Sequence, residues 1–330
     1  MGIQEEIKKE LLKEIYGNID NIYDFIDARF KLDTSCNDGV IKKLNELGLK
    51  VVSVKGSGYQ LLEPIELLDP NKIINNLDLQ IKNLISEIDV HWSIASTNSH
   101  CLAYIKNNFT SGYVCLAEHQ MNGRGRRGRK WVSPLAGNLY LSLVWRFACG
   151  AEILEGFSLA IAIAVANALK GDFSLQGVKL KWPNDILLDN KKIGGILIEI
   201  MGEAGGPCSV VVGIGINVSV SNVVENEIGQ PWIDLNSALG REISRNQLAA
   251  SILNRLVPLL QLYERDGFFE FRKEWMKYDA FAGSKVIVQS GVDDFFEGVA
   301  HGISESGELL VDGNGYLRAF KSGEVSLRRV

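Results

Sequence analysis

Residues 123–130 read Gly-Arg-Gly-Arg-Arg-Gly-Arg-Lys, with five cations and three glycines in eight positions. They follow a predicted apolar strand and match the glycine spacing GxGxxG of dinucleotide-binding loops. Such a loop needs a helix to begin at its glycines, so that helix amides face a pyrophosphate. Here Trp-Val-Ser-Pro follows at 131–134, which predicts no helix. The stretch therefore argues against a dinucleotide-binding fold. It favours a loop that closes over a phosphate-bearing ligand with arginine forks and backbone amides, and a solvated basic loop is the simpler alternative.

A second basic stretch, Lys-Leu-Lys-Trp-Pro-Asn-Asp at 179–185, predicts a strand that ends at Pro183. The alternation of a strand places Lys179 and Lys181 on one face and apolar residues on the other. A lysine at the end of a strand can reach a carboxylate or a phosphate as a compact charge. A surface strand with solvated lysines is the alternative.

Small and polar residues mark three further stretches. Glycines in 194–199 and 213–217 lie in predicted strands, where a missing side chain lets a ligand or a neighbouring backbone approach. Ser-Thr-Asn at 96–98 suits an amide-like or ureido ligand and suits a helix N-cap equally well. None of these signals is specific when taken alone.

The composition indicates a globular protein without a global basic surface. The 330 residues are 46% hydrophobic, and 35 Lys and Arg against 40 Asp and Glu give a net charge of −5, so any polyanion site must be local. The five cysteines are widely spaced without metal-ligand spacing, as expected of reduced cytosolic thiols. The N-terminus lacks the pattern of a signal peptide, and the longest apolar stretch, 157–169, is too short to span a bilayer. We therefore expect a cytoplasmic protein that does not enter a membrane.

The N-terminal residues 3–62 predict short helices followed by a β-hairpin. Apolar residues recur at helical spacing, and a third helix is expected over about 35–47, ending at Gly48. Strands are expected at 49–54 and 59–61 around a glycine-containing turn. Three helices and a two-stranded wing are typical of a winged helix-turn-helix, a DNA-reading architecture.

The remainder predicts a mixed α/β region followed by a small β domain. In the α/β region, helices are expected at 157–169, 245–265 (bent or interrupted at Pro258) and 268–277, and strands at 113–118, 139–146, 178–182, 193–200 and 209–218. After residue 283, glycine-containing turns separate five short stretches, which predict a β-barrel with strands at 285–289, 294–303, 308–311, 317–321 and 324–328.

Taken in chain order, these features resemble the BirA-type biotin protein ligases. The resemblance covers essentially the whole chain and rests on the winged N-terminus, the stretches at 96–98, 123–131, 181–185, 194–199 and 213–217, and Gly-Glu-Val-Ser-Leu-Arg at 323–328. It implies an α/β (α+β) multidomain protein with three parts. These are a winged helix-turn-helix at 1–63, a central mixed α/β ligase domain of the class II synthetase-like type at 64–282, and an SH3-like β-barrel at 283–330.

The resemblance also implies roles for individual residues. The residues implied to bind biotin are Ser96, Thr97, Asn98, Gln120, Arg124, Gly125, Arg126 and Lys181. Those implied to bind the nucleotide are Arg126, Arg129, Trp131, Asn184, Asn217, Glu324 and Arg328. Two of them are implied to be catalytic: Lys181 between the biotin carboxylate and the ATP α-phosphate, and Arg126 closing on the adenylate phosphate. No ligand of Mg²⁺ is assigned.

By the same resemblance, ATP with Mg²⁺ and biotin give biotinyl-5′-AMP and pyrophosphate. A lysine of the biotin carboxyl carrier protein of acetyl-CoA carboxylase then takes the biotinyl group. Because one anion attacks another, fixed cations would lower the barrier, and no covalent nucleophile is needed. The mixed anhydride hydrolyses in water, so an ordered loop at 123–130, with 219–232 as a second lid, would protect it.

The N-terminal region departs from the pattern of a DNA-binding repressor. Residues 1–62 carry 9 Lys and Arg against 10 Asp and Glu, a poor charge for phosphate contacts. In the expected recognition helix at 33–43, Asp33 and Asp38 would face phosphates, and no Arg or Gln offers a bidentate base contact. Repression through operator DNA is therefore an additional property that the sequence does not decide. The resemblance also implies a homodimer formed through the edge of the central sheet.

Two rival functions belong to other classes. A lipoyl or octanoyl transferase relative should carry an Arg-Gly-Gly motif with His, absent here, and should lack the winged helix and the barrel. A biotin-sensing DNA-binding repressor without ligase activity would have little use for Arg126 and Lys181. Biotin-dependent release of pyrophosphate distinguishes the ligase from the sensor.

Overall fold

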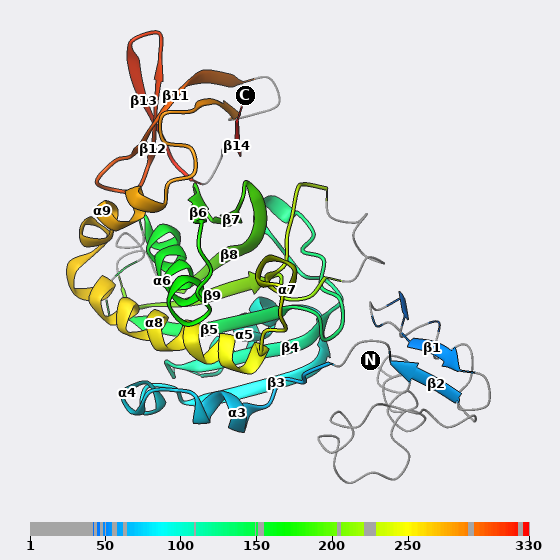
Figure 1. The fold of residues 1–330 in the computed structure, drawn as a ribbon. Coiled ribbons are helices and arrows are strands. Elements are labelled where there is room, and N and C mark those ends of the chain that lie inside the picture. Colours follow the sequence, from blue (N-terminus) through cyan, green and yellow to red (C-terminus); the bar gives the residue numbers. More distant parts are fainter. Residues whose placement is uncertain are drawn as a thin grey trace.

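A seven-stranded mixed sheet forms the centre of the computed structural model (Figure 1). The structure describes residues 65–108, 110–148, 150, 155–202, 206–220, 229–289, 294–322 and 326–329, and, nearer the N-terminus, 42, 45, 46, 49, 51–54 and 58–61. The strand order is β3-β4-β5-β9-β8-β7-β6. β3 and β4 are parallel, and every other neighbouring pair is antiparallel. The strands are β3 (Glu87–Ile94), β4 (Tyr113–Gln120), β5 (Leu139–Phe147), β6 (Val178–Lys181), β7 (Asp185–Leu188), β8 (Lys191–Gly202) and β9 (Cys208–Ile216).

Helices cover both faces of this sheet (Figure 1). α5 (Thr97–Ile105) packs on β4, β5, β8 and β9 from one side. The other side carries a larger apolar core, to which α3 (Pro70–Asn75), α4 (Leu79–Lys82), α6 (Phe157–Asp172), α8 (Arg245–Asp266) and α9 (Phe269–Tyr278) contribute. A short helix, α7 (Leu235–Leu239), follows the loop after β9. None of the helices that the structure describes combines the length and the apolar composition of a bilayer-spanning segment.

The burial of each element agrees with how apolar its sequence is. In β9 the run Val210–Val212 is fully buried, because a central strand between two helical layers has no solvent face. α6 is buried on most of its surface, as its apolar sequence predicts, since it lies between the sheet, α8 and α9. α8 runs uninterrupted through Pro258, so the expected interruption is wrong. The buried neighbours Val257 and Leu259 hold that turn in place through tertiary packing.

The C-terminal residues form a five-stranded antiparallel sheet in the order β13-β12-β11-β10-β14. All five predicted strands are present: β10 (Lys285–Gln289), β11 (Phe295–Ile303), β12 (Leu309–Gly313), β13 (Tyr316–Phe320) and β14 (Ser326–Arg329). Asn314 and Gly315, both with positive φ, connect β12 to β13 as a two-residue hairpin turn requires. Trp182 Nε1 donates to the carbonyl of Gly307 at 3.0 Å and joins this sheet to the central region.

Near the N-terminus the two predicted wing strands are present as a hairpin of β1 (Val51–Val54) and β2 (Gly58–Leu61). Most of the three predicted helices lie outside the described residues, although Lys42, Asn45 and Glu46 are helical. β3 was not expected as a strand, and a helix at α5 was considered only as the alternative in which 96–98 form an N-cap. β3 alternates polar with apolar residues, whereas α5 begins with four polar residues, and polar positions of both belong to sites described below.

Candidate active site

A cavity of about 1070 Å³ opens between the central sheet, the loop at 123–131 and the C-terminal sheet. The structure brings most of the predicted site residues to its wall. These are Ser96, Thr97, Asn98, Gln120, Arg124, Gly125, Arg126, Arg129, Trp131, Lys181 and Asn184. The described lining residues carry seven cationic side chains and one carboxylate, that of Asp185, so the cavity favours an anionic ligand.

One end of the cavity is a buried, uncharged polar cradle at the start of α5. The Thr97 amide and hydroxyl both donate to Gln120 Oε1, at 2.9 and 3.2 Å, and Gln120 Nε2 donates to Ser133 Oγ at 3.1 Å. Ser142 Oγ lies 2.7 Å from Thr97 Oγ1 and 2.6 Å from Asn98 Oδ1. Ser96 occupies the N-cap of α5 without a side-chain cap bond, and it also lines the cavity. Fixed donors and acceptors of this kind select a neutral polar ligand by shape.

Asn98 is held in one orientation by the strands behind it. Its Nδ2 donates to Glu199 Oε2 at 2.8 Å and to the Leu197 carbonyl at 3.2 Å. Arg124 donates to both oxygens of Glu199 at 3.0 Å, so its side chain is paired with a carboxylate of β8. Gly213 leaves room for the amide, because a Cβ there would lie 2.8 Å from Asn98 Cγ. This glycine in β9 is therefore required by close approach.

The other end of the cavity is basic. Lys192 Nζ lies 2.5 Å from Asp185 Oδ1, and Lys181 Nζ lies 4.0 Å from Asp185 Oδ2. The Lys192 ammonium also sits 5.3 Å from the centre of the Trp131 ring. A Cβ at Gly215 would lie 2.7 Å from that ring, so the glycine of β9 makes space for the indole. Two lysines around one carboxylate leave a net positive charge where the indole offers a flat apolar surface.

Arg126 crosses from the loop toward the C-terminal sheet. The loop makes only a 3₁₀ turn at Arg126–Gly128, so no α-helix begins at the glycines, as predicted. The Arg126 guanidinium donates to Asn184 Oδ1 at 3.4 Å and to the carbonyl of Ser322. Burial lowers the pKa of this guanidinium, and Asp185 opposes that effect. A desolvated cation bonded to neutral oxygens is suited to receive an anion.

Three predicted nucleotide residues are not placed at the cavity. Asn217 is buried behind the wall, where its Nδ2 donates to the carbonyls of Lys192 and Ile233 at 3.3 and 3.2 Å. This amide joins the start of β8 to the loop at Ile233, and Asn217 is not among the residues that line the cavity. Glu324 lies outside the described residues, and only the backbone of Arg328 is described, within β14. The neighbouring Leu327 does reach the cavity wall.

Two family models match the chain. Residues 92–217 match the biotin/lipoate A/B protein ligase family, and residues 281–328 match the biotin protein ligase C-terminal domain. The bifunctional ligase/repressor BirA of Escherichia coli strain K12 is 39% identical over 288 residues, which cover 87% of this chain and 87% of that protein. The chain is a member of the biotin protein ligase family. The biotin–[acetyl-CoA-carboxylase] ligase of Paracoccus denitrificans is 33% identical over 70% of this chain and 96% of its own length.

A solved biotin protein ligase shares the fold. The Aquifex aeolicus enzyme, determined in complex with biotin and ATP, superposes with a TM-score of 0.64 and 28% identity, covering 74% of this chain and 100% of that one. The match of residues 281–328 to a biotin protein ligase C-terminal domain also argues against a lipoyl or octanoyl transferase, which was expected to lack such a domain.

In this biotin protein ligase, sequence reasoning missed several residues that shape the site. Lys192 and Asp185 form the ion pair of the basic end, and Ser142 and Glu199 orient the polar cradle. Asp185 and Glu199 lie in the stretches at 179–185 and 194–199, but neither was predicted as a site residue. Lys192 carries a usable signal, because it lies at the start of β8, two residues before that strand's glycines, whereas nothing local marks Ser142 in its apolar strand.

Proposed function

We propose that the chain is a biotin protein ligase that joins biotin to ATP and then transfers the biotinyl group to a carrier lysine. The observation that carries the proposal is one cavity with a neutral polar cradle at one end and clustered cations at the other. Biotin has the same polarity, with a ureido ring at one end and a carboxylate at the other. Family membership and the two family models support the same function.

At the polar end, we assign the ureido ring to Ser96, Thr97, Asn98 and Gln120. These residues are at most 9% exposed. Hydrogen bonds between Thr97 and Gln120, and from Asn98 to Ser142 and Glu199, fix the direction of three of the four side chains before a ligand arrives. Such preorganised donors and acceptors bind a ureido group because it presents both kinds of partner in one plane. The apolar part of biotin would extend from there toward Trp131.

At the basic end, the biotin carboxylate oxygen attacks the α-phosphorus of ATP, and the bond to pyrophosphate breaks. We assign Lys181 to the carboxylate and α-phosphate, and Arg126, Arg129 and Asn184 to the nucleotide. Lys192 joins Lys181 in this role because the two share Asp185. Fixed cations offset the repulsion between the two anions and the charge that develops on the phosphoryl oxygens.

In the second half-reaction, the carrier lysine amine attacks the acyl carbon of biotinyl-5′-AMP and AMP leaves. The carrier is the biotin carboxyl carrier protein of acetyl-CoA carboxylase. The loop at 123–131 would cover the anhydride, and Arg126 would hold this loop to the C-terminal sheet. From that sheet, Glu324 and Arg328 are proposed to reach the nucleotide. Covering the anhydride excludes water until the carrier arrives.

A magnesium ion would enter this site with ATP. Asp185 is the only carboxylate among the described lining residues, and two lysines neutralise it. A cage of protein carboxylates is therefore not built here, and the donor set fits an ion held mainly by the phosphates, as is usual for Mg²⁺. When bound, the ion neutralises phosphate charge and helps pyrophosphate to leave.

Four further properties are proposed, which concern DNA binding, the C-terminal barrel, the location in the cell and the oligomeric state. The residues at 1–63 form a winged helix-turn-helix whose acidic recognition helix binds operator DNA weakly, so repression is an additional role. The C-terminal sheet closes as an SH3-like barrel. The protein is cytoplasmic, and it forms a homodimer through the edge of the central sheet when the adenylate is bound. The relatives named as ligase/repressors support the DNA role, and the acidic N-terminus limits it.

The test is transfer of biotin to the biotin-acceptor domain of a carboxyl carrier protein, with ATP and Mg²⁺. We expect wild type to release pyrophosphate only when biotin is present and to label one carrier lysine. Lys181→Ala should reduce adenylate formation at least a hundredfold, because it removes a charge beside the reacting anions. Lys179→Ala, on the same strand but outside the cavity, is the matched control. Absence of biotin-dependent pyrophosphate in wild type would support the sensor function instead.

A further inference from the structure

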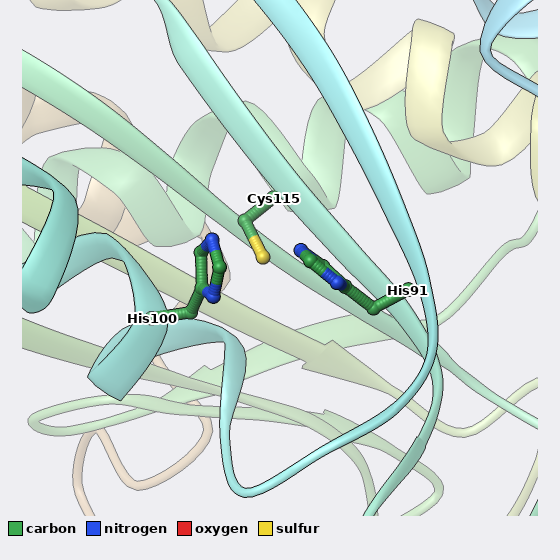
Figure 2. A group of neighbouring side chains, drawn as sticks. All are labelled: His91, His100 and Cys115. Carbon is green, nitrogen blue, oxygen red and sulfur yellow. The ribbon is translucent and has the colours of Figure 1, made fainter. Parts of the chain in front are cut away.

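Two imidazoles and one thiol meet on the α5 side of the sheet (Figure 2), and none of the three residues lines the cavity described above. The register of the parallel strands pairs Asp89 of β3 with Cys115 of β4, and alternation places His91 on the same face as Asp89. His100 reaches the same spot from α5, and Figure 2 shows the Cys115 sulfur between the two rings. Three consecutive elements, β3, α5 and β4, therefore contribute one ligand-type atom each.

The distances between the ligand atoms of this cluster are close to those of a tetrahedral zinc site. The ligand atoms of His91, His100 and Cys115 all lie within 4.8 Å of one another. A tetrahedral zinc site, with Zn–N of about 2.0–2.1 Å and Zn–S of about 2.3 Å, holds its ligand atoms roughly 3.3–3.8 Å apart. The widest pair must approach by roughly 1 Å, which side-chain rotation supplies without moving the strands.

The cluster can be reached from solvent, although its sulfur is enclosed. The side chains of His91 and His100 are 25% and 35% exposed, whereas Cys115 is fully buried and carries a free thiol. An ion could therefore enter between the imidazoles and meet the sulfur at the bottom.

A carboxylate and a phenol frame the imidazoles. Asp89 Oδ2 lies 2.9 Å from His91 Nε2 and 3.7 Å from His100 Nε2, and it accepts a hydrogen bond from Tyr113 at 2.8 Å. The Nε2 atom of His91 is buried, yet it makes no well-aligned hydrogen bond. Carboxylates beside histidines fix ring orientation in metal sites and raise the basicity of the ligands.

We propose that His91, His100 and Cys115 bind a divalent transition metal ion of the Zn²⁺ class, with Asp89 beside them to orient the imidazoles. A thiolate with two imidazoles selects Zn²⁺, Co²⁺ or Cu²⁺ over Mg²⁺ and Ca²⁺, which prefer oxygen ligands. On binding, Cys115 gives up its thiol proton to solvent and the sulfur donates a lone pair to the ion. A hydrogen-bonded His–Cys contact without metal affinity is the alternative.

The site has a structural consequence for the cavity. His100 follows Thr97 and Asn98 by less than one turn of α5, and Cys115 lies on the strand that ends at Gln120. A bound ion would tie the first turn of α5 to β3 and β4, directly behind the polar cradle. Because the ion binds the folded state, it should also raise the temperature of unfolding.

The experiment uses the purified full chain, stripped of metal with a chelator and titrated with Co²⁺ as a spectroscopic probe. We expect one equivalent to give a thiolate-to-cobalt charge-transfer band that Zn²⁺ abolishes by displacement. Added Zn²⁺ should raise the melting temperature. Mg²⁺ at the same concentration should do neither.

Matched variants decide between the cluster and other sites. Cys115→Ser and His100→Gln should lose the band and the thermal shift, with far-ultraviolet circular dichroism confirming the fold. Cys208→Ser, which changes another buried thiol, and His301→Gln, which changes an exposed imidazole, should keep both. The proposal is wrong if wild type shows no band, or if the band survives both cluster variants.

Discussion

At the scale of single residues, the polar cradle depends on the missing side chain of Gly213. A methyl group there would overlap the amide of Asn98, which also contacts Ser142, Leu197 and Glu199. Gly213→Ala should therefore turn Asn98 away from its bonding position. We expect the KM for biotin to rise about tenfold or more, equivalent to about 1.4 kcal/mol, with a smaller change in kcat. Pyrophosphate release at varied biotin concentration measures both constants.

The matched control is Gly171→Ala in α6, which is exposed and does not line the cavity, and where a Cβ meets only the end of the flexible Arg255 side chain at 2.9 Å. It should leave the KM for biotin within twofold of wild type. An unchanged KM in Gly213→Ala would show that Asn98 does not contact biotin, and the cradle would need reassignment.

A second residue, Asp279, makes stability depend on pH. It is 9% exposed, its Oδ1 accepts from the amide of Phe281 at 2.9 Å, and its Oδ2 is buried without a hydrogen-bond partner. Burial raises the pKa of this carboxyl above its usual 3.8, although the Phe281 and Ala282 amides and Lys179 oppose the shift. The folded state therefore favours the protonated acid. The stabilising contribution is complete below pH 3.8 and is lost as pH rises through the raised value.

Asp279→Asn should remove this dependence, since an amide keeps the acceptor for Phe281 without a charge to desolvate. We expect the variant to melt at a higher temperature than wild type at pH 7, with the difference shrinking toward pH 4. Melting curves between pH 4 and pH 8 measure the slope. Parallel curves for the two proteins would contradict the assignment.

At the scale of elements, the hydrophobic pattern predicted the fully buried strands and helices, but it missed an element whose structure depends on contacts with distant parts of the chain. β9 and α6 were found because a continuous apolar run has few alternatives in a folded chain. β3 is an edge strand with Asp89, His91 and Ser93 on one face, and only pairing with β4 makes it a strand. The cradle was located from Ser-Thr-Asn, but its supports Ser142 and Glu199 come from strands 44 and 101 positions away, a distance that no local pattern records.

The start of α8 carries the element-scale prediction. Arg245 NH1 lies 2.8 Å from Glu118 Oε2 of β4, with both side chains 3% exposed, and it donates to the Asn138 carbonyl at 3.2 Å. Arg245→Ala would leave the Glu118 carboxylate buried without its cation. We expect a loss of about 3–5 kcal/mol in the free energy of unfolding, measured by urea denaturation.

Arg265→Ala, near the other end of α8, is the control for this ion pair. Arg265 pairs with Asp266 while 72% exposed, so solvent screens the interaction and no measurable loss is expected. Equal losses in the two variants would show that helix content, and not the buried pair, sets the cost.

At the scale of the whole molecule, side chains of the central region contact the C-terminal sheet and hold it beside the cavity. Three side chains donate hydrogen bonds to backbone carbonyls of the C-terminal region. Trp182 Nε1 donates to Gly307, Arg272 Nε donates to Ile303 at 2.9 Å, and Arg126 donates to Ser322. The first two hold the C-terminal sheet in place. Arg126 connects this sheet to the glycine-rich loop through a side chain that also lines the cavity. Retention of the reactive adenylate should therefore depend on Arg126.

Arg126→Gly should release biotinyl-5′-AMP at least tenfold faster than wild type, because the loop loses both its bond to Asn184 and its contact with the C-terminal sheet. The free anhydride would then acylate lysines of bystander proteins, which labelling of an added albumin detects. Arg127→Gly is the matched control. Arg127 is exposed in the same loop at a φ of 59°, which glycine adopts without strain, so this variant should retain the adenylate. Equal labelling by both variants would mean that general loop flexibility, and not the bridge made by Arg126, controls retention.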